Sequence, residues 1–85
     1  MIFNNWEIEL KSGKTKTVSI NISEAGGHEH DTTAMLDAAK QKADIFEVFD
    51  VAIVNNSNST IRLKDTVFNI QEIAAISCNT KEIRE

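Results

Sequence analysis

The sequence predicts one small α+β domain with the order ββαβββ, in which a mostly antiparallel sheet packs on a single helix. Three observations favour this class. The 85 residues fit one domain, several segments alternate between apolar and polar residues as half-buried strands do, and one alanine-rich segment has helical spacing. We place the domain at residues 1–78 and expect residues 79–85 to form a polar C-terminal tail.

The first two predicted strands form a hairpin. Residues 6–11 alternate with Trp6 and Ile8 on one face, residues 17–22 alternate with Val18 and Ile20 on one face, and a Ser-Gly turn lies between them. A two-residue loop would put these apolar residues on opposite faces of the sheet. We therefore expect a longer loop or a bulge, with Ile8 opposite Val18 and Trp6 opposite Ile20.

A helix is predicted over residues 32–43, after a loop at residues 23–30 that contains Gly26 and Gly27. Asp31 or Thr32 can cap its N-terminus. The predicted apolar positions are Met35, Leu36, Ala38, Ala39 and Ala43. The small side chains among them favour close packing on a sheet.

The second half of the chain predicts further strands. Residues 46–54 are rich in β-branched and aromatic residues and apolar on both faces, which favours a central strand. This strand would pair with residues 60–64, with Ile53 opposite Ile61. Residues 67–78 fit either one helix or two short strands joined by a helical turn, and their β-branched residues favour the strands.

Charge and composition exclude several function classes. Thirteen acidic residues against nine basic ones give a net charge of -4, which disfavours nucleic-acid binding. No segment has the length and apolar character of a membrane span, and the N-terminus does not resemble a signal peptide, so we expect no membrane partner and a cytoplasmic location. The single Cys78 has an apolar sequence context and is expected to be a buried structural thiol.

The residue types with the most chemistry are gathered in the loop before the predicted helix. His28 and His30 point the same way in an extended segment and could bind a divalent metal, with Glu24 as a third ligand. The alternative is a polar loop in which Asp31 caps the helix and Glu29 lies near its positive end. The loop lacks the spacing of a phosphate-binding motif, and we expect no cofactor.

No nucleophile motif or acid-base pair stands out elsewhere, so the sequence predicts no catalytic residues and a protein that is not an enzyme. The apolar residues on both faces of 46–54 are the better indication of function. Either the N-terminal hairpin folds over the second face to give a small barrel or sandwich, or another chain covers it. The candidate interface residues are Trp6, Phe46, Val48 and Val54.

The leading hypothesis is therefore a non-enzymatic protein-interaction module that associates with itself as a homo-oligomer. One alternative is a small-ligand or metal-binding protein that uses the loop at residues 23–31, and a second is an acidic inhibitor that mimics nucleic acid. The small size and the abundance of Ile, Asn and Lys resemble those of small accessory proteins of phages or mobile elements from low-GC bacteria.

Overall fold

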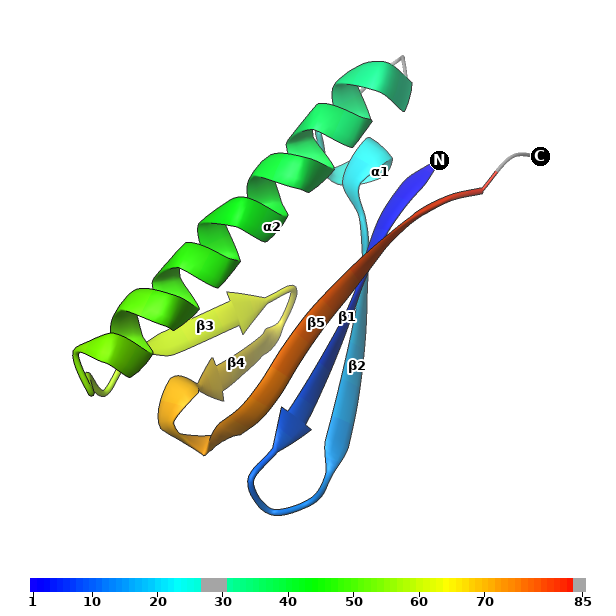
Figure 1. The fold of residues 1–85 in the computed structure, drawn as a ribbon. Coiled ribbons are helices and arrows are strands. Elements are labelled where there is room, and N and C mark those ends of the chain that lie inside the picture. Colours follow the sequence, from blue (N-terminus) through cyan, green and yellow to red (C-terminus); the bar gives the residue numbers. More distant parts are fainter. Residues whose placement is uncertain (27–30, 84–85) are drawn as a thin grey trace.

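The computed structural model describes residues 1–26 and 31–83. Two strands, β1 (Ile2–Leu10) and β2 (Thr15–Asn21), are followed by a short helix α1 (Ile22–Gly26) and a long helix α2 (Asp31–Val54). The strands β3 (Thr60–Leu63) and β4 (Thr66–Asn69), a 3-10 turn η1 (Ile70–Glu72) and the strand β5 (Ile73–Glu82) complete the described fold (Figure 1). Residues 23–26, predicted as loop, thus lie in α1.

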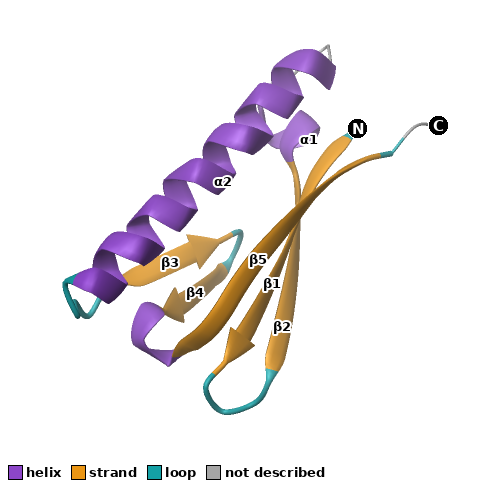
Figure 2. Cartoon of the chain, viewed as in Figure 1, coloured by secondary structure: helices purple, strands orange, loops and turns teal. Residues whose placement is uncertain are grey.

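The predicted class and the order ββαβββ are confirmed, with five strands in two antiparallel sheets and one main helix. The larger sheet has the order β2-β1-β5, and β3 and β4 form a separate hairpin. The described strands do not close into a barrel. Figure 2 shows α2 along one side of the molecule, with β3 and β4 between its C-terminal half and the three-stranded sheet.

The hairpin of β1 and β2 has the predicted faces but a different register. Trp6 is opposite Val18 and Ile8 is opposite Lys16, two residues from the predicted pairing. The cause is the loop, in which the Leu10 N–H donates to the Lys14 carbonyl (2.8 Å) and the Gly13 N–H donates to the Leu10 carbonyl (2.9 Å). Only three residues therefore separate the paired ends, and a shift by two keeps every side chain on its face.

Gly13 allows this tight loop because its φ is 92°, in the region that side chains disfavour. We expect Gly13→Ala to lower the free energy of unfolding by about 1 kcal/mol. A Cβ at this position would meet no atom within 4 Å, so the loss would come from the backbone conformation alone. Gly13→Asn is the control in urea unfolding, because asparagine tolerates positive φ better; equal losses for both variants would contradict this explanation.

The predicted central strand at residues 46–54 is wrong, because these residues form the C-terminal part of α2. Elongating a helix that already exists costs little, and no Gly or Pro lies between Asp31 and Val54. Ile45, Phe49 and Ala52 are spaced to share the side of the helix that packs on the core. Ile61 consequently pairs with Phe68 instead of Ile53, and Leu63 pairs with Thr66.

The predicted apolar side of the helix is also largely wrong. Of the five predicted positions only Ala38 is buried, while Met35, Leu36, Ala39 and Ala43 are exposed. The buried side is instead formed by Ala34, Ala38 and Ala52, with Ile45 and Phe49 partly buried beside them. A considerable apolar surface of α2 therefore faces outward.

Residues 67–78 form two strands joined by a helical turn, which is the alternative that their β-branched residues favoured. β4 starts one residue earlier, at Thr66, and β5 extends beyond Cys78 to Glu82. The Asn69 side chain caps η1 by accepting from the Gln71 N–H (3.0 Å). The expected tail does not begin at Asn79, because β5 pairs with β1 as far as Glu82, which is opposite Ile2.

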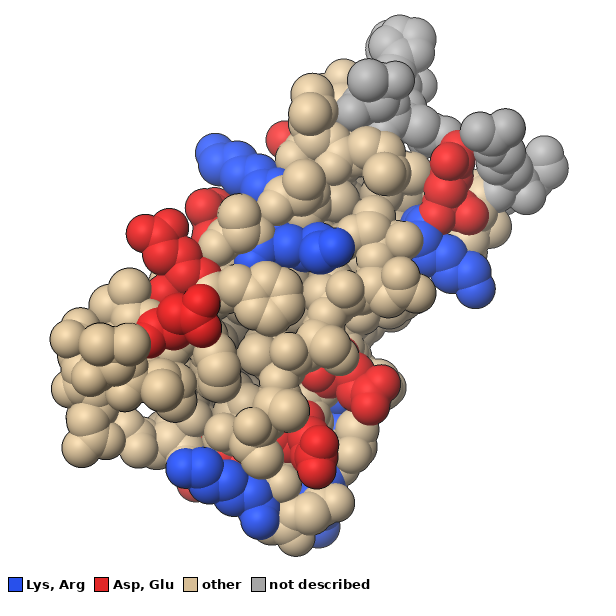
Figure 3. All heavy atoms as spheres, viewed as in Figure 1, with Lys and Arg blue, Asp and Glu red and all other residues tan. Residues whose placement is uncertain are grey.

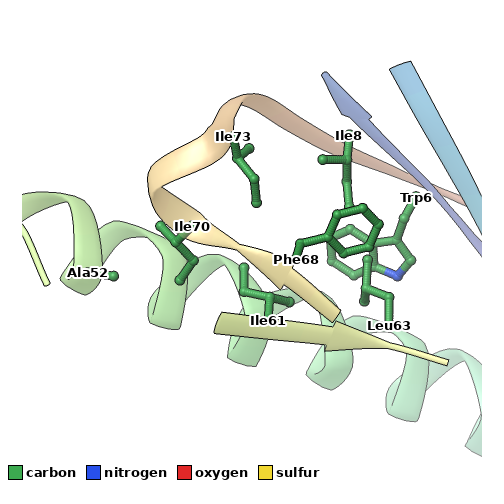
Figure 4. Close-up of a cluster of buried hydrophobic side chains, with 8 residues drawn as sticks. All are labelled: Trp6, Ile8, Ala52, Ile61, Leu63, Phe68, Ile70 and Ile73. Carbon is green, nitrogen blue, oxygen red and sulfur yellow. The ribbon is translucent and has the colours of Figure 1, made fainter. Parts of the chain in front are cut away.

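The main core lies where the three-stranded sheet, the hairpin of β3 and β4 and α2 meet (Figure 4). Trp6 and Ile8 contribute from β1, and Leu63 and Phe68 contribute from the hairpin. The other buried members are Ala52, Ile61, Ile70 and Ile73. A second cluster of Ile2, Ile22, Ala34 and Ala38 holds the start of α2 against the other end of the sheet.

Candidate interaction surface

A buried polar network fixes the position of α2 on the sheet. Asn4 is fully buried on β1, and its Nδ2 donates to the Ala38 carbonyl (3.1 Å) and to Gln41 Oε1 (2.9 Å). Gln41 Oε1 also accepts from Trp6 Nε1 (3.2 Å), and Asn4 Oδ1 accepts from the Thr80 hydroxyl (2.7 Å). The network joins β1, β5 and α2, so the outer side of the helix is presented in a defined orientation.

Sequence analysis missed Asn4 because the first strand was expected to begin at Trp6. The signal was present, since Ile2 and Asn4 continue the parity of Trp6 and Ile8 toward the N-terminus, and all four side chains are buried. A polar residue in that series indicates a buried hydrogen-bonded group.

The C-terminal third of α2 exposes apolar side chains on several sides. Val48, Val51 and Ile53 are 49%, 51% and 48% exposed, and Val54 is 83% exposed. The segment from Ile45 to Val54 is apolar except for Glu47 and Asp50. A helix that is hydrophobic all round is usually buried on all sides, whereas this one has protein on one side only.

One continuous strip runs along the exposed side of α2, and we call it the outer face of α2. Its ends are Leu36, which is 69% exposed, and Val54. They are separated by five helical turns and so lie on the same side of the helix. The exposed residues between them on this side are Lys40, Ala43, Glu47 and Asp50.

A shallow pocket adjoins the outer face near the end of α2. Val48, Val51 and Ala52 line one side, and Ser57 and Ser59 of the following loop line the other. The hydroxyl groups of these two serines lie 3.1 Å apart. Figure 3 shows this end of the molecule, at the lower left, as an area with few charged side chains.

Of the four predicted interface residues, two pack against the core and two are exposed. Trp6 is 1% exposed and belongs to the core, where its ring lies 5.5 Å from that of Phe46. Phe46 is half-buried on the side of α2 that meets the sheet. Val48 and Val54 are exposed on α2, so these two remain available to a partner.

The predicted metal ligands His28 and His30 lie outside the described residues. Glu24, the proposed third ligand, lies in α1, where its N–H donates to Asn21 Oδ1 (3.0 Å) and its carboxylate accepts from Asn21 Nδ2 (3.3 Å). Within residues 1–26 and 31–83, no three metal-binding side chains come together.

Cys78 is half-buried on β5, against the main core. Burial raises the pKa of its thiol above the ordinary value, and the positive charge of Lys42 opposes this shift. A thiol with a raised pKa is a poor nucleophile at neutral pH. The burial expected for Cys78 is met only in part.

Comparison of the chain with protein-family models, curated proteins and solved structures found no match. None of the helices in the described part of the chain combines the length and apolar character needed to cross a membrane. Figure 3 shows acidic and basic side chains interspersed over one face. On this face the carboxylates are not gathered into the single acidic surface that mimicry of nucleic acid needs.

Proposed function

We propose that this protein is a non-enzymatic interaction module that forms a homodimer through the outer face of α2. The observation that supports the proposal is the outer face itself, which carries the exposed Leu36 and Val54 at its two ends, on a helix whose other side is fixed by the Asn4 network. Exposed apolar surface of this kind marks interaction sites in small proteins. A second copy is the partner that the pattern of the outer face fits best.

The outer face is complementary to itself when two helices pair antiparallel around a two-fold axis that passes between Ala43 and Glu47. Leu36 then meets Val54 of the second copy, and Val54 meets its Leu36, as a two-fold interface requires. In the same register Lys40 lies beside Asp50 of the second copy. The two ends of the contact are therefore apolar, Lys40 and Asp50 form pairs of opposite charge, and Ala43 lies beside Glu47 of the second copy.

The apolar ends supply most of the affinity in this arrangement. Burying a Leu or Val side chain gains roughly 1.5–3 kcal/mol, whereas an exposed ion pair contributes about 0.2–1 kcal/mol. Association costs about 4–15 kcal/mol in lost freedom. With the cost of association near the lower end of this range, the net gain corresponds to a dissociation constant between about 1 µM and 1 mM, and the charges set the orientation of the helices.

Sedimentation equilibrium from about 10 µM to 1 mM covers this range, and the apparent mass should rise toward that of a dimer. Val54→Glu should weaken association by about tenfold or more, because it removes two apolar contacts and places charge in them. Val67→Glu is the matched control, since Val67 is also exposed but lies on β4. A concentration-independent monomer, or equal effects of both variants, would refute the proposed interface.

Sedimentation equilibrium also tests the antiparallel register of the two helices. Lys40→Asp and Asp50→Lys should each weaken the dimer, and the double variant should restore it, because each ion pair is then reversed. Failure of the double variant to recover would show that the helices pair in another register.

A further inference from the structure

The edge of β2 is open to solvent in the described structure. In the order β2-β1-β5, β2 borders only β1. The hydrogen bond between the Leu10 N–H and the Lys14 carbonyl marks the first bonded pair of this ladder. Because bonded and non-bonded pairs alternate, Lys16, Val18 and Ile20 direct their backbone groups to β1. Thr17 and Ser19 direct theirs to the open edge.

A groove lies between β2 and α2. Ile20 of β2 and Ile45 of α2 give it apolar walls, and Gln41 lines it between them. Asp37, Lys40 and Asp44 line it from α2. An open strand edge next to such a groove is the geometry in which an extended peptide can add as a further strand, with alternate side chains directed toward the helix.

Gln41 gives the groove a hydrogen-bond donor of fixed orientation. Its Oε1 is held on the inner side by Asn4 Nδ2 (2.9 Å) and Trp6 Nε1 (3.2 Å). Reversing the amide would bring the Gln41 NH2 group against these two donors, so its orientation is fixed. The NH2 group is thereby directed away from them and can donate to a carbonyl oxygen.

The charges of the groove favour a cationic side chain. Asp44 is exposed and lines the groove from α2, one helical turn from Lys40. A lysine or arginine next to Asp44 would gain an exposed ion pair, whereas a glutamate would be repelled.

We propose that this groove binds an extended peptide that adds to the edge of β2. Side chains at positions i and i+2 of a strand point to the same face. The peptide therefore carries an aliphatic residue, which packs between Ile20 and Ile45, and a lysine or arginine two positions away, which meets Asp44. This surface is separate from the outer face of α2 apart from Lys40, which adjoins both.

Two synthetic peptides test the proposal, acetyl-TITKTIT-amide and the same peptide with glutamate in place of lysine. Titrated to about 2 mM against the labelled Val54→Glu protein, the lysine peptide should shift the backbone amide signals of Thr17 and Ser19. The glutamate peptide should bind at least about threefold more weakly, as one ion pair implies. The use of Val54→Glu keeps the outcome independent of dimer formation.

Asp44→Lys should reverse this preference, and Asp65→Lys is the matched control on the turn between β3 and β4, where Asp65 is exposed. No shift with the lysine peptide would overturn the proposal. So would equal affinity for both peptides, or shifts confined to β5 or to the outer face of α2. Retained preference in the Asp44→Lys protein would also overturn it, because the charge in the groove would then have no part in selection.

Discussion

Asn4→Asp is expected to lower the free energy of unfolding at neutral pH by about 3 kcal/mol or more. Asn4 is fully buried, and its Nδ2 donates to two oxygens, the Ala38 carbonyl and Gln41 Oε1. An ionised carboxylate would turn an acceptor toward both of them. A domain of this length is stable by about 4–13 kcal/mol, so the loss is a large fraction of the total.

The loss in free energy of unfolding that Asn4→Asp causes should increase as the pH rises. Burial raises the pKa of a carboxyl group at this position above its unfolded value of about 3.9. Below that value the group is protonated in both states, and its single O–H can replace one of the two hydrogen bonds that Asn4 Nδ2 donates, so the loss is smaller. The loss grows as the pH rises, because only the unfolded chain releases the proton readily. Urea unfolding at about pH 4 and pH 7, each compared with the unchanged protein, measures this difference.

Asn79→Asp is the matched control, because Asn79 is exposed on β5. It should change stability little at either pH. A similar loss for both variants, or a loss for Asn4→Asp that does not grow with pH, would show that the buried network does not distinguish amide from carboxylate.

Truncation after Cys78 is the second change with a large expected effect, because the removed residues belong to a paired strand. Residues 79–82 lie opposite Asn5, Asn4, Phe3 and Ile2 in the ladder of β1 and β5. Their loss also removes the Thr80 hydroxyl that donates to Asn4 Oδ1. Each of these backbone and side-chain hydrogen bonds contributes about 0.5–1.5 kcal/mol, so we expect the free energy of unfolding to fall by roughly 3–6 kcal/mol.

Thermal unfolding followed by circular dichroism measures the effect of the truncation, with Lys81→Ala, a change at an exposed position of β5, as control. The control should melt close to the unchanged protein. If the truncated chain did so too, the C-terminal half of β5 would contribute nothing to stability, against the pairing described above.

Patterns within short segments of the sequence predicted the faces of the strands, but not the register between them. The alternation in the first two strands gave the correct faces because side-chain direction has a strict period of two. The register was wrong because it depends on the conformation of one loop residue, Gly13, whose φ of 92° shortens the loop. The strands β4 and β5 were favoured over a single helix because residues 67–78 are rich in β-branched side chains.

The C-terminal half of α2 could not be distinguished from a strand by its composition. Residues 46–54 are apolar on both faces, and such a run fits a central strand and a buried helix equally well. What decides between them is the helix that already precedes the segment, together with the packing of Phe49 and Ala52 on the core. That contact is tertiary, and no window of sequence contains it.

The candidate surfaces were predicted unevenly for the same reason. Val48 and Val54 were identified as surplus apolar residues and remain exposed, although they lie on a helix instead of a sheet face. Trp6 was ambiguous because a tryptophan serves equally in a core or an interface, and only its contacts with Gln41 and Phe46 decide. The groove at β2 joins residues more than fifteen positions apart, so no local motif could reveal it.

The place of β1 in the larger sheet has a consequence for how the chain folds during synthesis. β1 is made before the other described strands, yet it is the central strand, between β2 and β5. The hairpin with β2 can form soon afterwards, but more than sixty residues separate the end of β1 at Leu10 from the start of β5 at Ile73. Until β5 has left the ribosome, one edge of β1 lacks its partner strand, so the three-stranded sheet forms later than the hairpin of β1 and β2.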